Sequence, residues 1–291
     1  MAGKIAVVTG SNKGIGYAIV KELCKRGVSV VYLTARDIQR GQKAVEELKK
    51  EGYSPSFYQL EVNNEDNVKS FAKHLKKTHG GLDILINNAG VIVKDFRETT
   101  YEDSVHVLDI NYKAILTIEK YIYPLLKNNA RVINVSSDCG HISNINNKYW
   151  IERLTKDDLG QEDVDDFVEW FLDSVKNGTI NYNDFAENTL VAYRVSKVAL
   201  CALSKVQQKQ IGRNISINSL HPGFVKTSMT KGAGYLTMDE AAQTPAYLAL
   251  DVDQTVKGKY FWFDKTEKDW QNYDLKLYPK LAMIENELKS M

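Results

Sequence analysis

Short apolar segments alternate with segments of helical period along the first half of the chain. The apolar, β-branched runs cover about residues 4–10, 29–35, 54–62, 82–90 and 130–137. Between them, apolar positions recur every three or four residues, over about residues 14–26, 38–50, 65–78 and 101–127. Strands that alternate with helices predict βαβ units, and therefore an α/β domain with a doubly wound parallel sheet.

An acidic segment interrupts this alternation. Residues of about 143–185 contain a helical pattern at 161–178 and lie just before another predicted helix at 190–208. We expect this segment to be a helical insertion between a strand and the helix that follows. No low-complexity linker separates it from the rest, so we expect residues 1–291 to form a single domain.

The alternation resumes after the insertion. A strand is predicted at about 214–223 and a helix at 237–250, which begins with a capping box of Thr237 and Glu240. A last strand is predicted at about 258–263. The residues of about 271–291 are amphipathic, and we expect them to form a C-terminal tail.

Composition and charge exclude several classes of protein. Apolar residues make up 43% of the chain and the net charge is +1, which gives no electrostatic reason to bind nucleic acid or an anionic membrane. The three cysteines and five histidines have no metal-type spacing, so we expect no metal site. The thiols suit a reducing compartment, and the chain enters a strand too early for a signal peptide, which favours the cytoplasm.

A glycine-rich turn follows the first strand. Gly10, Gly14 and Gly16 in TGSNKGIG would permit a tight turn and let backbone N–H groups approach a pyrophosphate at a helix N-terminus. A plain turn between a strand and a helix is the alternative. Arg36 stands about 20 residues further on, where an acid usually binds the adenosine ribose. A cation there suits a 2′-phosphate and favours NADP(H), although the adjacent Asp37 leaves a ribose contact open.

Tyr193 and Lys197 lie four residues apart in a predicted helix, on one helix face. A nearby ammonium stabilises a phenolate and lowers the pKa of the phenol, as a proton donor requires. Tyr123 and Lys127 have the same spacing, so the pair alone is not informative. We expect Tyr123 to have a packing or surface role.

These motifs together resemble the short-chain dehydrogenases/reductases, and within them the monomeric carbonyl reductases. The matching stretches are TGSNKGIG, NNAG (87–90), Asn111 in DINY, VINVSS, YRVSK and HPGFVKT (221–227). The resemblance implies a Rossmann-like sheet of about seven strands and a nicotinamide cofactor. It also implies a catalytic set of Asn111, Ser137, Tyr193 and Lys197.

The resemblance also implies the role of each member of this set. Tyr193 would protonate the carbonyl oxygen, and Ser137 would be a second donor that orients it. Lys197 would lower the pKa of Tyr193 and bind the nicotinamide ribose, and Asn111 would anchor a water that relays protons to Lys197.

The expected binding residues extend over the whole chain. The expected cofactor contacts are Gly10, Asn12, Lys13, Gly14, Ile15, Gly16, Arg36, Arg40, Glu61, Val62, Asn88, Ala89, Gly90, Tyr193, Lys197, Pro222, Gly223, Val225 and Thr227. Glu61 stands where the family usually has an aspartate beside the adenine. Cys139, His141 and Phe224 are candidates for the substrate pocket, with loop or core packing as the alternative.

The sequence therefore predicts NADPH-dependent reduction of ketones, aldehydes or quinones to alcohols. A specialised steroid, terpenoid or alkaloid ketone reductase is one alternative, and a non-catalytic NADP(H)-binding redox sensor is another. Ser137 and Tyr193 lie 56 positions apart, more than most of the family needs. The insertion between them would cover the helix of Tyr193 with its own apolar residues, and we expect a monomer. The covering residues would be Trp150, Phe167, Trp170 and Phe171.

Overall fold

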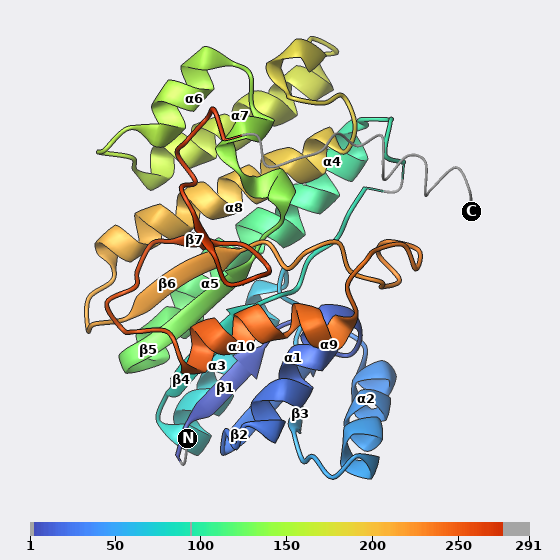
Figure 1. Cartoon of the computed structure of the whole chain (residues 1–291), viewed down its shortest axis with the longest axis vertical. Helices are drawn as coiled ribbons and strands as arrows, with labels where there is room; N and C mark the ends of the chain where they lie inside the picture. Colours follow the sequence, from blue (N-terminus) through green and yellow to red (C-terminus); the bar gives the residue numbers. More distant parts are fainter. Residues whose placement is uncertain (1–2, 94, 276–291) are drawn as a thin grey trace.

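A single mixed sheet runs through the computed structural model, which describes residues 3–93 and 95–275. Its eight strands lie in the order β3-β2-β1-β4-β5-β6-β7-β8 (Figure 1). The strands are β1 Ile5–Val8, β2 Val30–Ala35, β3 Ser56–Gln59, β4 Leu82–Asn87, β5 Leu126–Val135, β6 Ser216–Leu220, β7 Tyr260–Phe261 and β8 Glu267–Lys268. Neighbours from β3 to β7 pair in parallel, and β8 pairs antiparallel with β7. The predicted doubly wound parallel sheet is confirmed, and the two-residue β8 adds an eighth strand.

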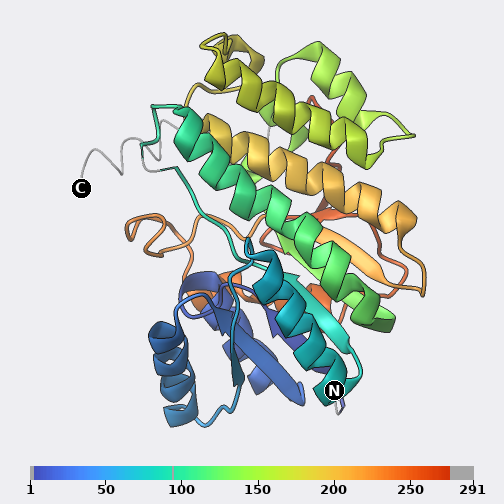
Figure 2. The same ribbon diagram turned by 180° about the vertical axis from the view of Figure 1, so that it is seen from behind.

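Helices cover both faces of the sheet (Figures 1 and 2). One face carries α1 Gly14–Lys25, α2 Ile38–Lys50, α9 Met238–Ala241 and α10 Gln243–Leu250. The other face carries α3 Glu65–His79, α4 Tyr101–Leu108, α5 Ala114–Ile122 and α8 Val191–Gln210. The capping box predicted before residue 238 is present, because Thr237 Oγ1 accepts the N–H of Glu240 at 3.2 Å. None of the helices in the described part of the chain has the length and hydropathy that a bilayer crossing requires.

The two faces of the sheet contribute to two separate apolar cores. Within β1, Val7 belongs to the core under α3, α5 and α8, and Val8 to the core under α1, α2 and α10. Successive side chains of a strand point to opposite faces, which explains this division. Strand β1 is apolar throughout, whereas β4, β5 and β6 also contain polar residues such as Asn87, Asn134 and Asn218.

The prediction of one continuous helix over 101–127 is wrong. The segment forms α4, a π-helix at Asp109–Lys113, α5 and a 3₁₀ turn at Tyr123–Leu125, after which β5 begins at Leu126. Pro124 has no N–H to continue the helix, which explains the end of α5. The π-helix carries Asn111, whose side chain is bound to a neighbouring loop.

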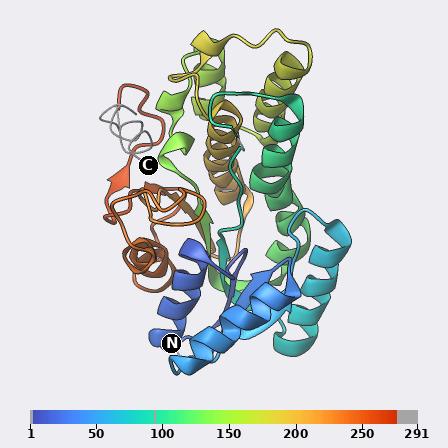
Figure 3. The same cartoon turned by 90° about the vertical axis from the view of Figure 1, so that its right-hand side faces the viewer.

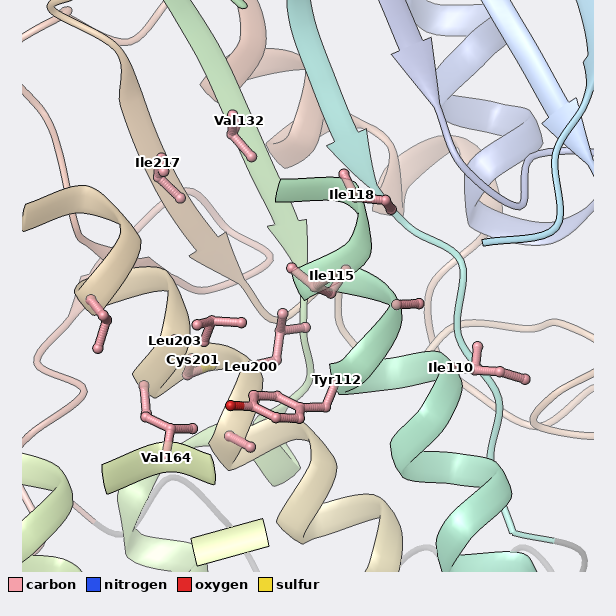
Figure 4. Packing of buried hydrophobic residues seen from close by; sticks show 14 of the residues in the cluster. Ile110, Tyr112, Ile115, Ile118, Val132, Val164, Leu200, Cys201, Leu203 and Ile217 are labelled. Atoms are coloured by element: carbon pink, nitrogen blue, oxygen red, sulfur yellow. The ribbon is translucent and has the colours of Figure 1, made fainter. Parts of the chain in front are cut away.

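The insertion forms two helices, α6 Lys148–Thr155 and α7 Gln161–Lys176, which lie outside α4 and α8 (Figures 2 and 3). Trp150, Phe167 and Phe171 are buried, and Trp170 packs against them. Figure 4 shows Val164 of α7 below Tyr112 and below Leu200 of α8. The Tyr112 hydroxyl donates to Asp165 Oδ1 at 2.7 Å. The insertion therefore covers α8. Residues 276–291 of the predicted C-terminal tail lie outside the described residues.

Candidate active site

A cavity of about 500 Å³ lies where the parallel strands end. Most of the predicted contact residues line it. They are Gly10, Asn12, Lys13, Gly14, Ile15, Gly16, Arg36, Glu61, Val62, Asn88, Ala89, Gly90, Tyr193, Lys197, Pro222 and Thr227. Ligands of doubly wound sheets bind at this edge. Residues that sequence reasoning did not select also line the cavity, including Asn63, Ile92, Ile110 and Met229.

The glycine turn is held by the NNAG segment. Gly10 has a φ of +59°, and a Cβ there would lie 2.8 Å from Ala89 Cα, so both conformation and space require glycine. Asn88 Nδ2 donates to the carbonyls of Thr9 and Gly10 at 2.9 and 3.0 Å. Thr9 Oγ1 accepts the N–H groups of Asn88 and Ala89, both at 3.0 Å. Thr9 is a structural residue that the sequence reasoning missed, although it directly precedes Gly10.

The first turn of α1 is open to an anion. No side chain caps the N-terminus of α1, whereas Asp37 caps α2 and Asn64 caps α3. Uncapped N–H groups and the positive end of the helix dipole attract phosphate. Because Gly14 and Gly16 of this turn also line the cavity, the local structure suits a pyrophosphate.

The cations near this turn have different positions. Arg36 lines the cavity, as does Lys13, whose Nζ donates to Ser228 Oγ at 2.9 Å. The Asp37 carboxylate accepts the N–H of Arg40 at 2.9 Å and is not among the lining residues. The Arg40 side chain is 69% exposed and lies 3.7 Å from the same carboxylate. The structure therefore does not place Arg40 at the cavity. The Asp37 carboxylate, for which a contact with the ribose was left open, caps helix α2.

Lys197 is buried beside the end of β5. Its Nζ donates to the Val135 carbonyl at 2.9 Å, and its side chain lies 5.6 Å from the centre of the Tyr193 ring. Burial disfavours the charged ammonium and lowers the pKa of Lys197 to about 8. The site therefore has a cation near the phenol that loses its proton close to physiological pH.

The pKa of Tyr193 is raised above its ordinary value in the free protein. Burial is the main cause, the groups of Cys139 and Asp138 add to it, and the Ser137 hydroxyl acts in the opposite direction. Burial of the phenol outweighs the other effects. Lys197 is not among the groups that cause this shift, so the lowering of the Tyr193 pKa by Lys197 stays a prediction.

Asn111 is fixed by its side chain. Its Oδ1 accepts the N–H of Val91 at 2.9 Å, and its Nδ2 donates to the Val91 carbonyl at 2.9 Å and to Ser196 Oγ at 3.0 Å. Both amide N–H groups are thus used, and Asn111 itself is not among the residues that line the cavity. Its position in a π-helix is typical of functional sites.

Ser137 is the second residue after β5 and is buried near Tyr193. Its hydroxyl donates to the Asp138 carboxylate and accepts the N–H of Cys139 at 3.2 Å. Ser136, not selected for catalysis, lines the cavity and bonds the Lys197 carbonyl at 3.3 Å. The structure thus brings Ser137, Tyr193 and Lys197 together.

The candidates for the substrate pocket differ in position. His141 is 0% exposed, and its ring nitrogens bond Ser143 Oγ and the Asp269 carbonyl, both at 2.9 Å, so it packs in the core instead of facing a substrate. Cys139 is buried next to Ser137, and burial raises the pKa of its thiol to about 12. Phe224 is half-buried, with its ring 6.4 Å from that of Tyr235.

Two further cofactor candidates, Gly223 and Val225, lie in the loop after β6 but do not line the cavity. Gly223 has a φ of +91°, which favours glycine, and the Val225 carbonyl accepts from Thr230 Oγ1 at 2.7 Å. Tyr123, as expected, has a packing role, because it is buried and its hydroxyl donates to Gln207 at 3.0 Å.

Comparison with known proteins agrees with this geometry. A family profile described as short chain dehydrogenase matches residues 4–149. The chain is 35% identical to carbonyl reductase (NADPH) 3 of Rattus norvegicus, over 92% of this chain and 98% of that protein. It is 34% identical to carbonyl reductase (NADPH) 1 of Homo sapiens, over 84% of this chain and 90% of that protein.

Among solved structures, salutaridine reductase from Papaver somniferum has a TM-score of 0.82 and 32% identity, covering 89% of this chain and 99% of that one. Menthone neomenthol reductase from Mentha piperita has a TM-score of 0.77 and 26% identity, covering 90% and 99%. The chain belongs to the short-chain dehydrogenase/reductase family.

Proposed function

We propose that this protein is an oxidoreductase that uses NADPH to reduce carbonyl compounds (ketones, aldehydes and quinones) to alcohols. The observation that carries the proposal is that one cavity is lined by the glycine turn, by Arg36 and by the Tyr193–Lys197 pair. The named activities of the two carbonyl reductases support the same reading. An NADPH-binding end and a proton-donating end therefore belong to one site.

The residues at the first turn fit NADPH. Gly14 and Gly16 at the uncapped end of α1 would hold the pyrophosphate, and Arg36 with Lys13 would pair with the 2′-phosphate. The loop from Pro222 to Thr227 would border the nicotinamide end. Bound NADPH supplies the hydride, and the protein supplies orientation and protons.

The proton donor of the reaction is Tyr193 in this proposal. Hydride addition leaves negative charge on the carbonyl oxygen, and the Tyr193 hydroxyl donates its proton there. Ser137 donates a hydrogen bond to the same oxygen and orients it. Lys197 stabilises the tyrosinate that remains. Because the Asn111 side chain is occupied, a water that returns the proton would be anchored by the main-chain carbonyl of Asn111 in its π-helix.

A second candidate function is the reduction of one specialised ketone. The likeness to salutaridine reductase and menthone neomenthol reductase, both named for single substrates, favours it. Turnover of NADPH with a panel of ketones, aldehydes and quinones separates the two: many substrates with high KM support the general reductase, and one with low KM supports the specialised enzyme. Turnover with NADH in place of NADPH would contradict the role of Arg36.

A matched pair of variants tests the mechanism. Tyr193→Phe should lower kcat/KM by about 10²–10⁴-fold with NADPH binding intact, because only the proton donor is lost. Tyr123→Phe removes a phenol with the same spacing to a lysine, and should retain activity. Full turnover by Tyr193→Phe would refute the mechanism.

The protein is also proposed to be a cytoplasmic monomer. The support is that α7 of its own chain packs on α8 and α4 and occupies the outer side of these helices. Light scattering after size exclusion should give the mass of one chain. A stable dimer that persists on dilution would contradict this part of the proposal.

A further inference from the structure

Asp138 places a carboxylate directly beside the proposed proton donors. The Ser137 hydroxyl donates a hydrogen bond to Asp138 Oδ1, and the same oxygen accepts the N–H of Cys139 at 2.8 Å. The Asp138 side chain is 22% exposed. In the proposed reduction the Ser137 hydroxyl donates a hydrogen bond to the carbonyl oxygen of the substrate, so Asp138 competes with the substrate for this hydrogen bond.

The charge of Asp138 is not balanced by a neighbouring cation. His221 Nδ1 lies 3.7 Å from Asp138 Oδ1, but this nitrogen accepts the N–H of Asp138 at 2.8 Å and so carries no proton. Burial lowers the pKa of His221, which keeps its ring neutral. Within residues 3–93 and 95–275, no lysine or arginine forms an ion pair with Asp138. Among the described residues, the Asp138 carboxylate beside Ser137 therefore has no cationic ion-pair partner.

Aromatic rings gather in the loops that follow β6 and β7. The Tyr235 ring is 61% exposed and lies 6.4 Å from that of Phe224 and 5.8 Å from that of Phe263. Partial burial raises the pKa of Tyr235, and the charge of Asp138 raises it further, so this phenol lies within electrostatic range of Asp138. The His221 ring packs 4.3 Å from Trp262. Carboxylates and the faces of aromatic rings both attract an ammonium group.

We propose that Asp138 is a specificity-determining residue that binds a protonated amine of the substrate, so that the enzyme prefers amino ketones to neutral ketones. This inference rests on the proposed carbonyl reduction. An ammonium N–H would donate to the Asp138 carboxylate. The Ser137 hydroxyl is then released from Asp138 and donates to the carbonyl oxygen. No covalent bond changes in this step; a hydrogen bond moves, and the hydride and proton of the reduction are unaffected.

Two ketones of equal shape test the proposal. β-Dimethylaminopropiophenone is cationic at neutral pH, and isocaprophenone is its uncharged carbon isostere. The wild-type protein should show a kcat/KM about tenfold or more higher for the cationic ketone. Asp138→Asn should reduce this preference by about tenfold or more. The neutral ketone should be reduced faster by this variant, because an amide oxygen competes less for the Ser137 proton.

Two further variants separate recognition from folding. Asp264→Asn makes the same chemical change at an exposed aspartate next to Phe263, whose carboxylate bonds Thr266, and should leave the preference intact. Asp138→Glu keeps the charge and should retain a preference for the cationic ketone. The thermal midpoint of each variant checks its fold.

An equal fall of kcat/KM for both ketones in Asp138→Asn would overturn the inference, because a structural role does not distinguish the two. Turnover of other carbonyls, but of neither ketone of the pair, would overturn it and leave the proposed function intact. Absence of NADPH oxidation with every carbonyl would overturn both.

Discussion

The buried ammonium of Lys197 destabilises the folded state. Replacement of Lys197 by methionine should therefore stabilise the protein while abolishing its activity. The ammonium is 4% exposed and bonds one carbonyl, that of Val135. Methionine has similar length and no charge, so Lys197→Met removes the buried cation without opening a large cavity. Activity should fall at least about a hundredfold, because the proposed support of the tyrosinate is lost.

The size of the effect follows from the pKa of Lys197. Burial lowers this pKa from 10.5 to about 8, and each pKa unit corresponds to about 1.4 kcal/mol. The charged ammonium therefore costs about 3 kcal/mol at pH 7. In Lys197→Met, loss of the hydrogen bond to Val135 offsets about 1 kcal/mol of the gained stability. We expect the free energy of unfolding to rise by about 2 kcal/mol, and the melting temperature by about 4 °C.

Urea unfolding at several pH values measures this difference. The folded pKa of Lys197 lies below the unfolded one, so the unfolded chain holds more protons between about pH 8 and 10.5. The free energy of unfolding of the wild type should therefore rise with pH in this window. Its difference from that of Lys197→Met should shrink toward zero. Lys209→Met, at an exposed position of the same helix, is the control and should change stability by less than about 0.5 kcal/mol. A less stable Lys197→Met at pH 7, or a gap that stays constant to pH 10.5, would refute the reasoning.

Three other outcomes can be measured directly. Arg36→Ala should raise the KM for NADPH by about ten- to hundredfold and change the KM for NADH little. Arg40→Ala, which lies outside the cavity, should change neither KM. Equal effects of the two variants would contradict the geometry. Phe171→Ala should lower the free energy of unfolding by about 3–5 kcal/mol in urea, against less than about 1 kcal/mol for the exposed Tyr149→Ala, because only the first opens a cavity. The kcat of the wild type should fall as pH rises through about 8, where Lys197 loses its proton; a flat profile to pH 9 would contradict this.

The alternation of strands and helices could be predicted because it rests on local periodicity. Covered parallel strands are mostly apolar, and the apolar positions of amphipathic helices recur every three or four residues, so the order of elements follows from the sequence. The π-helix at Asp109–Lys113 could not be predicted, because apolar positions continue through it without a break. The strand β8 has two residues, too few for any pattern.

Two candidate residues do not line the cavity, for different reasons. His141 follows Ser137 closely in the sequence, but its ring bonds Asp269, 128 positions away, and this contact directs it into the core. Arg40 is four residues from Arg36, but its guanidinium is exposed, lies 3.7 Å from the Asp37 carboxylate and does not line the cavity. Motif spacing selects which residues are near the site, and tertiary contacts decide where each side chain points.

The burial of α8 has a consequence for how new activities arise on this scaffold. Fifteen of its twenty residues are buried, between the sheet, α4 and α7, so nearly every substitution along it disturbs the packing. The rings of Phe224 and Tyr235, in contrast, stand on loops with few such constraints. Mutational drift can therefore exchange residues of these loops, such as Phe224 and Tyr235, while the proposed proton-transfer residues of α8, Tyr193 and Lys197, stay unchanged. A lineage of such proteins would diversify in what it reduces and remain uniform in how it does so.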